Sequence, residues 1–494
     1  MIVLVRAPFL VVLAGLTVML ALSDRVAPWA LPLIALSVAS GVMASSFRLE
    51  LRKQWRVAVC VLVFVSLLAS WIVFSLTRLP SIPPFVDTTG IVVESRPWGR
   101  FNAVSVKTPQ GGFVLTLPFA SLTEGQRIRV QGNPRPFEGL RPSGPRASGS
   151  RASRPGGDDF REDRFWRARG MTARLSSVKT EPLPDRGFQG WNIHSWRYGL
   201  YRSIALYLPR LTGAYLNAAW TGKRDAGLDA AHRSWGTSHL LSVSGFHVGI
   251  VMMGASFILK RGRGRVYGLS FLLWSYVCLT GAPASAVRAG LMIQIALLGE
   301  LARRPSSALN SVSLAGVLLL ARSPFLFWDI GWRLSILAAL VIAALLERGT
   351  TNEWKIWLGI SPLIWIATFP QVSWTFGAVP LAGVLINFAA PPFFSFALTL
   401  ASAVAGVRLL RIPGTVFLSD SLLYVLEGTF KLWGVLADAV AHTIPLQLEW
   451  SPFFAYFAAV IFIVLLSRSL FVPWRSVVAL APLGALATVA LFGT

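Results

Sequence analysis

Long apolar runs alternate with short polar connections over most of the 494-residue chain. The runs are continuous and about 15–25 residues long, close to the length that a helix needs to cross a bilayer. Continuous apolar runs favour helices over the strands of a membrane barrel, in which apolar and polar residues alternate. The predicted spans are residues 2–22, 26–47, 57–77, 238–259, 266–282, 284–301, 307–321, 324–346, 356–376, 378–407, 450–467 and 475–493.

Residues 80–190 break this pattern. Segments such as FNAVSVKT (101–108) and GGFVLTLP (111–118) alternate or are β-branched, and Gly, Pro and Asn bound them. Such segments are typical of a small antiparallel barrel or sandwich. The prediction is therefore an α-helical polytopic membrane protein with about 10–12 transmembrane helices and an inserted β-rich soluble domain. Its parts are N-terminal helices (1–78), the β-rich domain (79–190), an interfacial helix and loop (191–237) and a second transmembrane domain (238–494).

Basic residues in the connections predict the orientation in the membrane. The loop RLELRKQWR (48–56) carries four basic residues against Glu50. Cytoplasmic loops collect Lys and Arg, so the N-terminus is predicted to be cytoplasmic and residues 79–190 to lie on the outer face. Residues 413–445 are interrupted by four charged side chains, and we expect an amphipathic helix at the outer face there.

The composition agrees with a membrane protein and adds a strong positive charge. Hydrophobic residues make up 54% of the chain and charged residues 14%, with a net charge of +24, whereas soluble domains are about 25% charged. Part of the excess follows from the orientation of the loops. The basic excess of the long β-rich segment does not, and it indicates either a solvated surface or attraction of a polyanion.

The sequence lacks several motifs that are typical of enzymes and metal sites. Cys60 and Cys278 both lie in apolar runs, where neither a structural disulfide nor a metal cluster is expected. The motifs GxxxxGK[ST], HExxH and GxSxG do not occur. The prediction is a protein that is not an enzyme and has neither a metal site nor a cofactor.

The densest polar cluster inside an apolar run is HLLSVSGFHVG (239–249), with His239, Ser242, Ser244, Gly245 and His247. Polar groups at membrane depth are costly and usually face the interior of a helix bundle or a water-filled cavity. Gly directly after Ser also indicates a broken or closely packed helix. The alternative is that the small residues pack helix against helix while the histidines lie near the interface.

Further polar residues interrupt later runs. The Arg288 guanidinium lies near the middle of a predicted span, where it must pair with a carboxylate or line water. Asp329 and Arg333, four residues apart, can form a local pair. Prolines beside polar side chains indicate interrupted helices. Together these features suggest a pathway for a polar cargo. The candidates that line it are His239, Ser242, Ser244, Gly245, His247, Pro283, Arg288, Asp329, Arg333, Gln371 and Asn387.

Five ordered segments resemble the ComEC-type competence proteins. HLLSVSGFHVGIV (239–251) looks like the signature of that family, and LTGAPASAVRAGLM (279–292) resembles its Pro-then-Arg-Ala span. SPFLFWDIGWRLSILAAL (323–340) and PLAGVLINFAAPPFFS (380–395) are similar to two more family segments. DDFREDRFWRARGM (158–171) resembles a stretch of the family's external domain. Phe246 and Arg333 stand where the family commonly has Leu and Gln.

The resemblance implies a fold and a function. It implies that the β-rich domain is OB-like and that the chain passes single-stranded DNA across the bacterial inner membrane in natural transformation. Many full-length members carry a C-terminal metallo-β-lactamase-like domain, so this sequence is expected to be a short form. Aromatic rings such as Phe101, Phe113 and Trp166 could stack on bases, although Phe113 fits an ordinary core position better. The candidates for external DNA contact are Trp98, Arg100, Arg127, Arg129, Arg164 and Arg167.

The implied partners are single-stranded DNA, the lipid bilayer, a periplasmic or surface DNA receptor, a cytosolic helicase or ATPase, a separate nuclease and a second copy of the chain. Two other classes of function remain open on the sequence. One is a transporter or flippase of another anionic substrate, which predicts normal DNA uptake in a deletion strain. The other is a non-transporting, decayed family member, which predicts that changes within residues 239–251 are tolerated.

Overall fold

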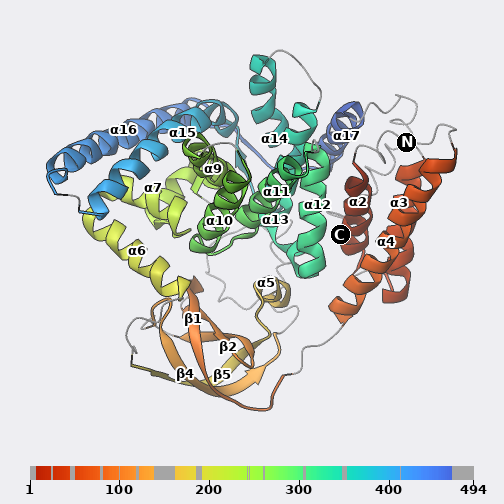
Figure 1. Ribbon diagram of the computed structural model, residues 1–494, viewed down its shortest axis with the longest axis horizontal. Coiled ribbons are helices and arrows are strands. Elements are labelled where there is room, and N and C mark those ends of the chain that lie inside the picture. Colours follow the sequence, from red (N-terminus) through yellow and green to blue (C-terminus); the bar gives the residue numbers. More distant parts are fainter. Residues whose placement is uncertain are drawn as a thin grey trace.

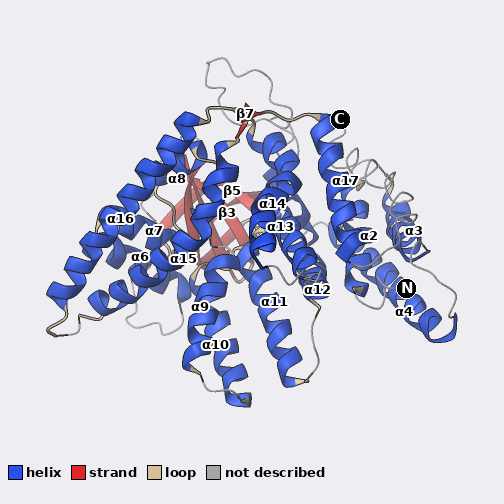
Figure 2. Cartoon of the chain, turned by 90° about the horizontal axis from the view of Figure 1, so that it is seen from above, coloured by secondary structure: helices blue, strands red, loops and turns tan. Residues whose placement is uncertain are grey.

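The computed structural model describes residues 7–23, 26–44, 51–77, 82–98, 101–117, 122–137, 162–184, 192–241, 243, 245–259, 262–303, 307–347, 353–411 and 413–469. In these ranges a small closed barrel lies on one side of a larger group of helices (Figure 1). Seen from above, the helices spread like a fan (Figure 2). Helix α16 (Val416–Thr443) forms one edge, and α3 (Leu31–Ala44) and α4 (Leu51–Thr77) form the other.

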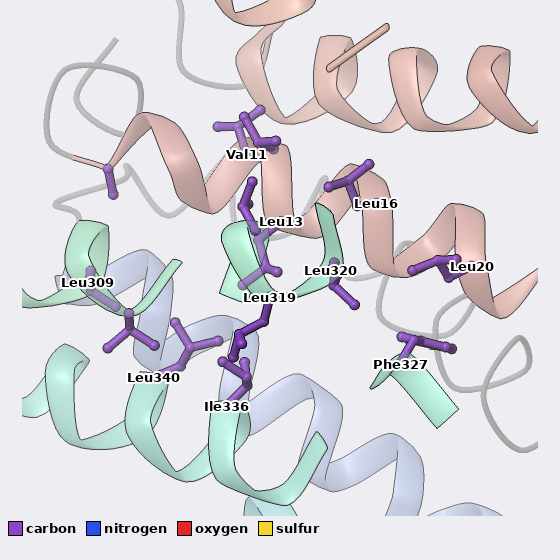
Figure 3. Packing of buried hydrophobic residues seen from close by; sticks show 14 of the residues in the cluster. Val11, Leu13, Leu16, Leu20, Leu309, Leu319, Leu320, Phe327, Ile336 and Leu340 are labelled. Carbon is purple, nitrogen blue, oxygen red and sulfur yellow. The ribbon is translucent and has the colours of Figure 1, made fainter. Parts of the chain in front are cut away.

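The three predicted N-terminal spans correspond to α2 (Pro8–Ala21), α3 and α4, with a 3-10 turn η1 (Pro28–Ala30) before α3. Helix α2 is apolar on all sides, which is typical of a helix buried among others. Leu13 and Leu16 of α2 meet α12 (Ala308–Arg322), and α13 (Ile330–Leu346) completes the same core (Figure 3). A Cβ on Gly316 of α12 would lie 3.1 Å from Leu13, so a small residue allows this close packing.

The β-rich segment forms a closed barrel with strand order β1-β2-β3-β5-β4. Strands β3 and β5 pair in parallel and the other neighbours pair antiparallel. Val104, Leu115 and Ile128 lie in a core that is closed to solvent, and the closed barrel confirms the small β-rich domain predicted from the sequence. The strands are β1 (Val86–Trp98), β2 (Phe101–Thr108), β3 (Gly111–Leu117), β4 (Arg127–Arg135) and β5 (Ala173–Pro182).

Four short helices connect the barrel with the rest of the molecule. Helix α5 (Glu162–Ala168) precedes β5 and lies between the barrel and the larger group of helices (Figure 1). Helix α6 (Ile193–Tyr207) leads away from the barrel and is followed by α7 (Arg210–Trp220) and α8 (Ala226–Ser234). The Asp225 carboxylate accepts a hydrogen bond from the Leu228 N–H at 2.9 Å and so caps α8.

The remaining elements form the centre and one side of the fan. Among the described residues, Val59–Thr77, Ala284–Leu301 and Ala382–Leu409 are long and apolar enough to cross a membrane, and six shorter apolar helices accompany them. The predicted span 475–493 lies outside the described residues. The elements are η2 (Ser238–Leu241), α9 (Gly245–Ile258), α10 (Arg263–Leu279), α11 (Ala284–Leu301), η3 (Pro324–Trp328), α14 (Glu353–Phe376), β6 (Val379–Pro380), α15 (Ala382–Leu409), β7 (Gln447–Leu448) and α17 (Pro452–Ser469).

Helix α16 lies in the segment 413–445, where an amphipathic helix at the outer face was expected. It has 28 residues and packs beside α15, one of the candidate spans. Two of its acidic residues are engaged by other helices: the Arg408 Nε donates to Asp420 at 2.5 Å, and the Trp235 Nε1 donates to Asp438 at 2.6 Å. Asp420 and Asp438 therefore serve contacts between helices, whereas Lys431 is exposed.

Candidate nucleic-acid path and interface

The polar segment 239–249 follows a close contact between two backbones. Gly236 has a φ of +72°, and a Cβ there would lie 3.2 Å from the Gly383 Cα in α15. The 3-10 turn η2 ends at Leu241, and α9 begins at Gly245, so the predicted helix break is present. His239 is exposed, whereas His247 is buried. Ser242 and Ser244 lie outside the described residues.

Arg288 lies next to the start of α9. A Cβ on Gly245 would lie 3.7 Å from an Arg288 guanidinium nitrogen. The Arg288 Nε donates to the Ser335 Oγ of α13 at 2.7 Å, and a second nitrogen lies 3.3 Å from the Met292 sulfur. Both of these partners are neutral, although a carboxylate or water was expected. Pro283 is the N-cap residue of α11, so Arg288 lies in the second turn of that helix and not at its middle.

A helix N-terminus carries a partial positive charge because its first N–H groups lack intrahelical partners. Together with the guanidinium of Arg288, the start of α9 therefore brings two positive centres to one place inside the helical group. Arg288 is 7% exposed, and burial strengthens electrostatic interactions. This arrangement favours the approach of an anion, since such sites commonly hold phosphates.

Asp329 and Arg333 contact other groups instead of forming the local pair expected from their spacing. The Asp329 carboxylate caps α13 by accepting from the Trp332 N–H at 3.1 Å, and it pairs with Arg169 of the barrel at 3.3 Å. The Arg333 Nε donates to the Phe327 carbonyl at 2.6 Å. Asp329 thus joins the barrel to the start of α13, because a partner from a distant segment replaces the local one.

Gln371 of α14 and Asn387 of α15 each carry a buried side-chain oxygen that has no hydrogen-bond partner in the described part of the chain. Both helices contain internal prolines, Pro370 in α14 and Pro391 and Pro392 in α15. A buried polar atom without a partner is costly unless water or a ligand satisfies it. These two positions remain candidates for a hydrated path.

The barrel surface presents some of the predicted contact residues. Arg129 is exposed, but its guanidinium donates twice to Asp87 at 2.9 Å, which holds the pKa of that carboxyl below its usual value. Arg127 is partly exposed, and Phe101 is exposed. Arg100 and the side chain of Trp98 lie outside the described residues.

Two aromatic rings proposed for base stacking belong to the barrel core. Trp166 is fully buried and Phe113 is 1% exposed. The position of Phe113 agrees with the sequence analysis, which favoured an ordinary core residue over base stacking. The prediction that Trp166 stacks on bases is wrong, because its ring is buried. Its indole N–H donates to Glu162, one turn earlier on α5, at 3.0 Å.

Arg164 and Arg167 also differ from the expectation of an outward surface. The Arg164 guanidinium lies 3.9 Å from the ring centroid of Trp328, and that of Arg167 lies 5.4 Å from Phe325. Both rings belong to η3, in the larger helical group. Arg164 and Arg167 lie one turn apart on α5, and the sequence did not show which segment covers the face that they share.

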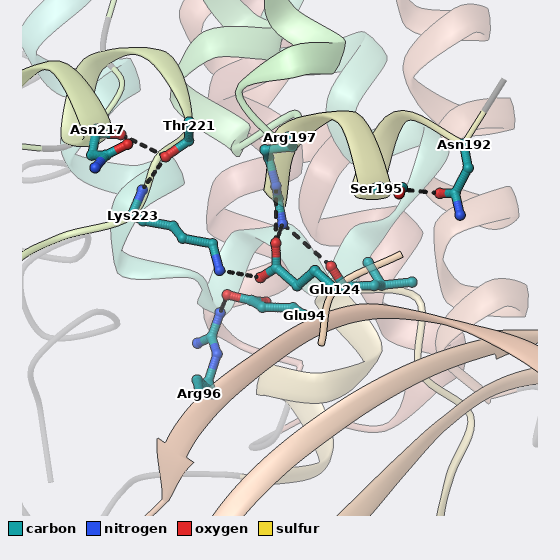
Figure 4. A network of polar contacts seen from close by, with 10 residues as sticks. Glu94, Arg96, Glu124, Asn192, Ser195, Arg197, Asn217, Thr221 and Lys223 are labelled. Atoms are coloured by element: carbon teal, nitrogen blue, oxygen red, sulfur yellow. Dashed lines mark hydrogen bonds and ion pairs between the residues drawn. The ribbon is translucent and has the colours of Figure 1, made fainter. Parts of the chain in front are cut away.

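A buried ion-pair network that sequence reasoning missed joins the barrel to α6 (Figure 4). The Arg197 guanidinium donates to Glu124 at 3.0 and 3.3 Å and to the Val93 carbonyl at 3.2 Å. Lys223 pairs with the same carboxylate at 3.1 Å. A Cβ on Gly281, in the turn before Pro283, would overlap the Arg197 guanidinium. Arg197 therefore fixes the barrel against the turn that starts α11.

Two more buried polar residues, Glu427 and His232, contact α7. The Glu427 carboxylate of α16 accepts from the N–H of Leu211 at 3.0 Å and of Thr212 at 2.8 Å, at the start of α7. His232 is fully buried, and its ring nitrogens contact the Tyr215 hydroxyl at 2.8 Å and the Thr237 hydroxyl at 2.9 Å. Burial lowers the pKa of His232 to about 4. In the sequence, Glu427 is one of the four charged residues that interrupt the apolar segment 413–445. The sequence did not show that it contacts the start of α7.

Comparisons with known proteins agree with the resemblance of the five segments. Residues 221–491 match the profile of the family described as competence protein. The chain is 30% identical over 194 residues to ComE operon protein 3 of Bacillus subtilis (strain 168), covering 37% of this chain and 24% of that protein. It is 31% identical over 171 residues to an uncharacterized protein of Aquifex aeolicus (strain VF5), covering 33% of this chain and 40% of that protein. No solved structure matches.

Apolar helices of spanning length, buried polar side chains between them and a small barrel fixed to one side are typical of a membrane protein with an inserted β-rich domain. The profile match covers more than half of the chain. The chain belongs to the ComEC-type competence protein family. It spans less than half the length of either relative named above.

Proposed function

We propose that this chain passes single-stranded DNA across the bacterial inner membrane during natural transformation. The observation that carries the proposal is the meeting of Arg288 with the N-terminus of α9, where Gly245 allows close approach. A polyanion crossing lipid needs cationic or dipolar stabilisation without tight trapping. Two adjacent positive centres with neutral partners meet that need. Family membership supports the same reading.

The proposed orientation follows the charge of the connections. The N-terminus lies in the cytoplasm, and the barrel lies on the outer face, where it gathers DNA through long-range attraction. The strand then passes between helices that carry His247, Gln371 and Asn387, whose buried polar groups support a hydrated route.

The pulling force comes from partners in this proposal. The sequence has no GxxxxGK[ST] loop to bind ATP through a known mechanism. A cytosolic helicase or ATPase draws the strand inward, a DNA receptor delivers it, and a separate nuclease removes the other strand. A second copy of the chain is a further proposed partner.

The test is a transformation assay on a clean deletion strain that is complemented with variants. We expect Arg288→Ala to lower transformation to the level of the deletion, because it removes the buried cation at the α9 N-terminus. The level of the protein in the membrane fraction checks insertion. Arg288→Lys keeps the charge but loses the planar fork, and we expect it to retain part of the uptake.

Arg322→Ala is the matched control, since Arg322 is exposed at the end of α12 and its loss should leave uptake unchanged. Transformation by Arg288→Ala at the wild-type frequency would contradict the proposed path. Normal transformation in the deletion strain itself would contradict DNA uptake as the function and favour another anionic substrate.

A further inference from the structure

The contact between α5 and η3 gathers arginines and aromatic rings from two distant segments. Arg164, Arg167 and Arg169 come from the barrel side, and Phe325, Trp328 and Arg333 come from the helical side. We call this group the arginine–aromatic junction. Figure 1 shows α5 lying between the barrel and the helical group at this place.

The junction carries more positive than negative charge among its described contacts. Asp329 pairs with Arg169 at 3.3 Å. Arg167 instead faces the Phe325 ring, and Arg333 faces the Phe327 ring at 4.7 Å and the Phe327 carbonyl. Burial lowers the pKa of Arg169, and the Asp329 carboxylate opposes this shift. Of the guanidiniums of Arg167, Arg169 and Arg333, that of Arg169 alone has a carboxylate partner within the described residues.

Stacking leaves the hydrogen-bonding edge of an arginine in a fixed orientation. A guanidinium that lies over a ring uses its flat face, whereas its N–H donors point outward in the plane. The Arg167 Nε is buried and lacks a hydrogen-bond partner in the described part of the molecule. Arginine edges of this kind match the oxygens of a phosphate, to which they donate in pairs.

The rings and the location point to a strand and not to a lone anion. Phe325 and Trp328 are partly exposed, and partly exposed rings adjoining cationic side chains are the usual platform for unpaired bases. Trp328 directly precedes Asp329, the N-cap residue of α13, and Ser335 on that helix holds Arg288. Ser335 lies six positions after Asp329, which is about 9 Å along the axis of the helix.

We propose that the arginine–aromatic junction binds single-stranded DNA where the strand passes from the barrel to the helices. Its guanidinium edges contact phosphates, and Trp328 and Phe325 stack bases. This inference rests on the proposed function and adds a site to it. Arg164 and Arg167 then contact DNA at the inner edge of the barrel, beside α13, and not on its outer surface.

The experiment uses the full chain in nanodiscs of neutral phosphatidylcholine and an oligothymidylate that carries a photoreactive 4-thiothymidine. After irradiation and digestion, mass spectrometry should find the label on peptides that contain residues 325–328 or 162–169. This readout requires no substitution, so it does not depend on how a variant folds. Labels confined to other peptides would overturn the junction as a binding site.

Affinity measurements with the same oligothymidylate test the chemistry. Arg167→Gln should lower the affinity severalfold and reduce the slope of log affinity against log salt by about 0.7, the value for one phosphate on a single strand. Trp328→Leu should lower the affinity and leave that slope unchanged. Arg135→Gln is the control, since Arg135 is exposed on β4 and contributes no ring or guanidinium to the arginine–aromatic junction, and it should bind like the wild type when thermal unfolding is unchanged.

The outcomes separate this inference from the proposed function. Wild-type binding without any effect of Arg167→Gln or Trp328→Leu overturns the junction and leaves the path at Arg288 standing. If Arg167→Gln lowers the amount of phosphatidylglycerol that the protein retains and leaves the oligothymidylate affinity unchanged, the junction is a lipid headgroup site. That result also overturns the inference. Normal transformation in the deletion strain overturns the proposed function itself.

Discussion

At the scale of single residues, several buried polar side chains contact partners on other elements, whereas Gln371 and Asn387 each keep a buried oxygen without a partner among the described residues. Arg197 meets Glu124 and the Val93 carbonyl, and His232 meets the hydroxyls of Tyr215 and Thr237. A buried polar group without a partner costs more than a satisfied one gains. Arg197 and His232 therefore each fix the distance between two segments.

The buried histidine gives a prediction for the effect of pH on stability. An unfolded histidine has a pKa near 6.5, whereas folded His232 has a pKa of about 4. As the pH falls below about 6.5, the unfolded chain binds a proton that the folded chain does not, so the contribution of His232 to stability is lost. By pH 5 this loss is about 2 kcal/mol.

Thermal unfolding in detergent at pH 7 and pH 5 measures the effect. His232→Gln should show a smaller drop in Tm between these two values than the wild type. His442→Gln is the matched control, because His442 is exposed on α16, and it should keep the full drop. An equal drop in His232→Gln and the wild type would show that another group carries the pH dependence.

At the scale of elements, the ends of helices are held by side chains from elsewhere in the chain. Asp329 caps α13 and also pairs with the barrel, and Glu427 of α16 accepts hydrogen bonds at the start of α7. A carboxylate at a helix N-terminus satisfies orphan N–H groups and complements the helix dipole. Such caps join elements that the chain order leaves far apart.

Glu427→Gln should weaken the attachment of α7 to α16. The amide keeps one acceptor but turns a donor towards N–H groups at the start of α7, so we expect a loss of about 2 kcal/mol and a lower Tm at neutral pH. Glu449→Gln should leave Tm unchanged, since Glu449 is exposed. Equal Tm values for the Glu427 variant and the wild type would exclude the cap as a significant stabilising contact.

At the scale of the whole molecule, the barrel is fixed to the helical group at two places. One is the network of Arg197, Glu124 and Lys223 beside Gly281 (Figure 4), and the other is the contact of α5 with η3. The two places lead directly into α11 and α13, the helices joined by Arg288 and Ser335. The barrel is therefore held over the helices that carry the proposed path.

Arg197→Ala should loosen one of these two attachments. It leaves Glu124 buried with Lys223 as its remaining partner, and removing one member of a buried pair costs on the order of 3 kcal/mol. Hydrogen exchange should rise at residues 122–126 and in the turn around Gly281. Arg202→Ala lies on the same helix but is exposed, and its exchange should match the wild type. Unchanged exchange in the Arg197 variant would mean that α5 and η3 alone hold the barrel.

The pattern of apolar and polar residues determined much of this protein by itself. Continuous apolar runs predicted the helices, alternation between residues 101 and 118 predicted strands, and Gly next to polar residues predicted the break before α9. These features are local, because a helix or a strand repeats its environment every few residues. The resemblance of ordered segments added the family.

The tertiary structure alone decided which side chains meet. Arg164 and Arg167 turned towards η3, Trp166 turned into the core, and the acidic residues of α16 met α7, α8 and α15. The partners of Glu427 lie more than 200 residues away along the chain. A periodic pattern shows that a face is buried or polar, but not which distant segment covers it, because that choice depends on how all the elements pack together.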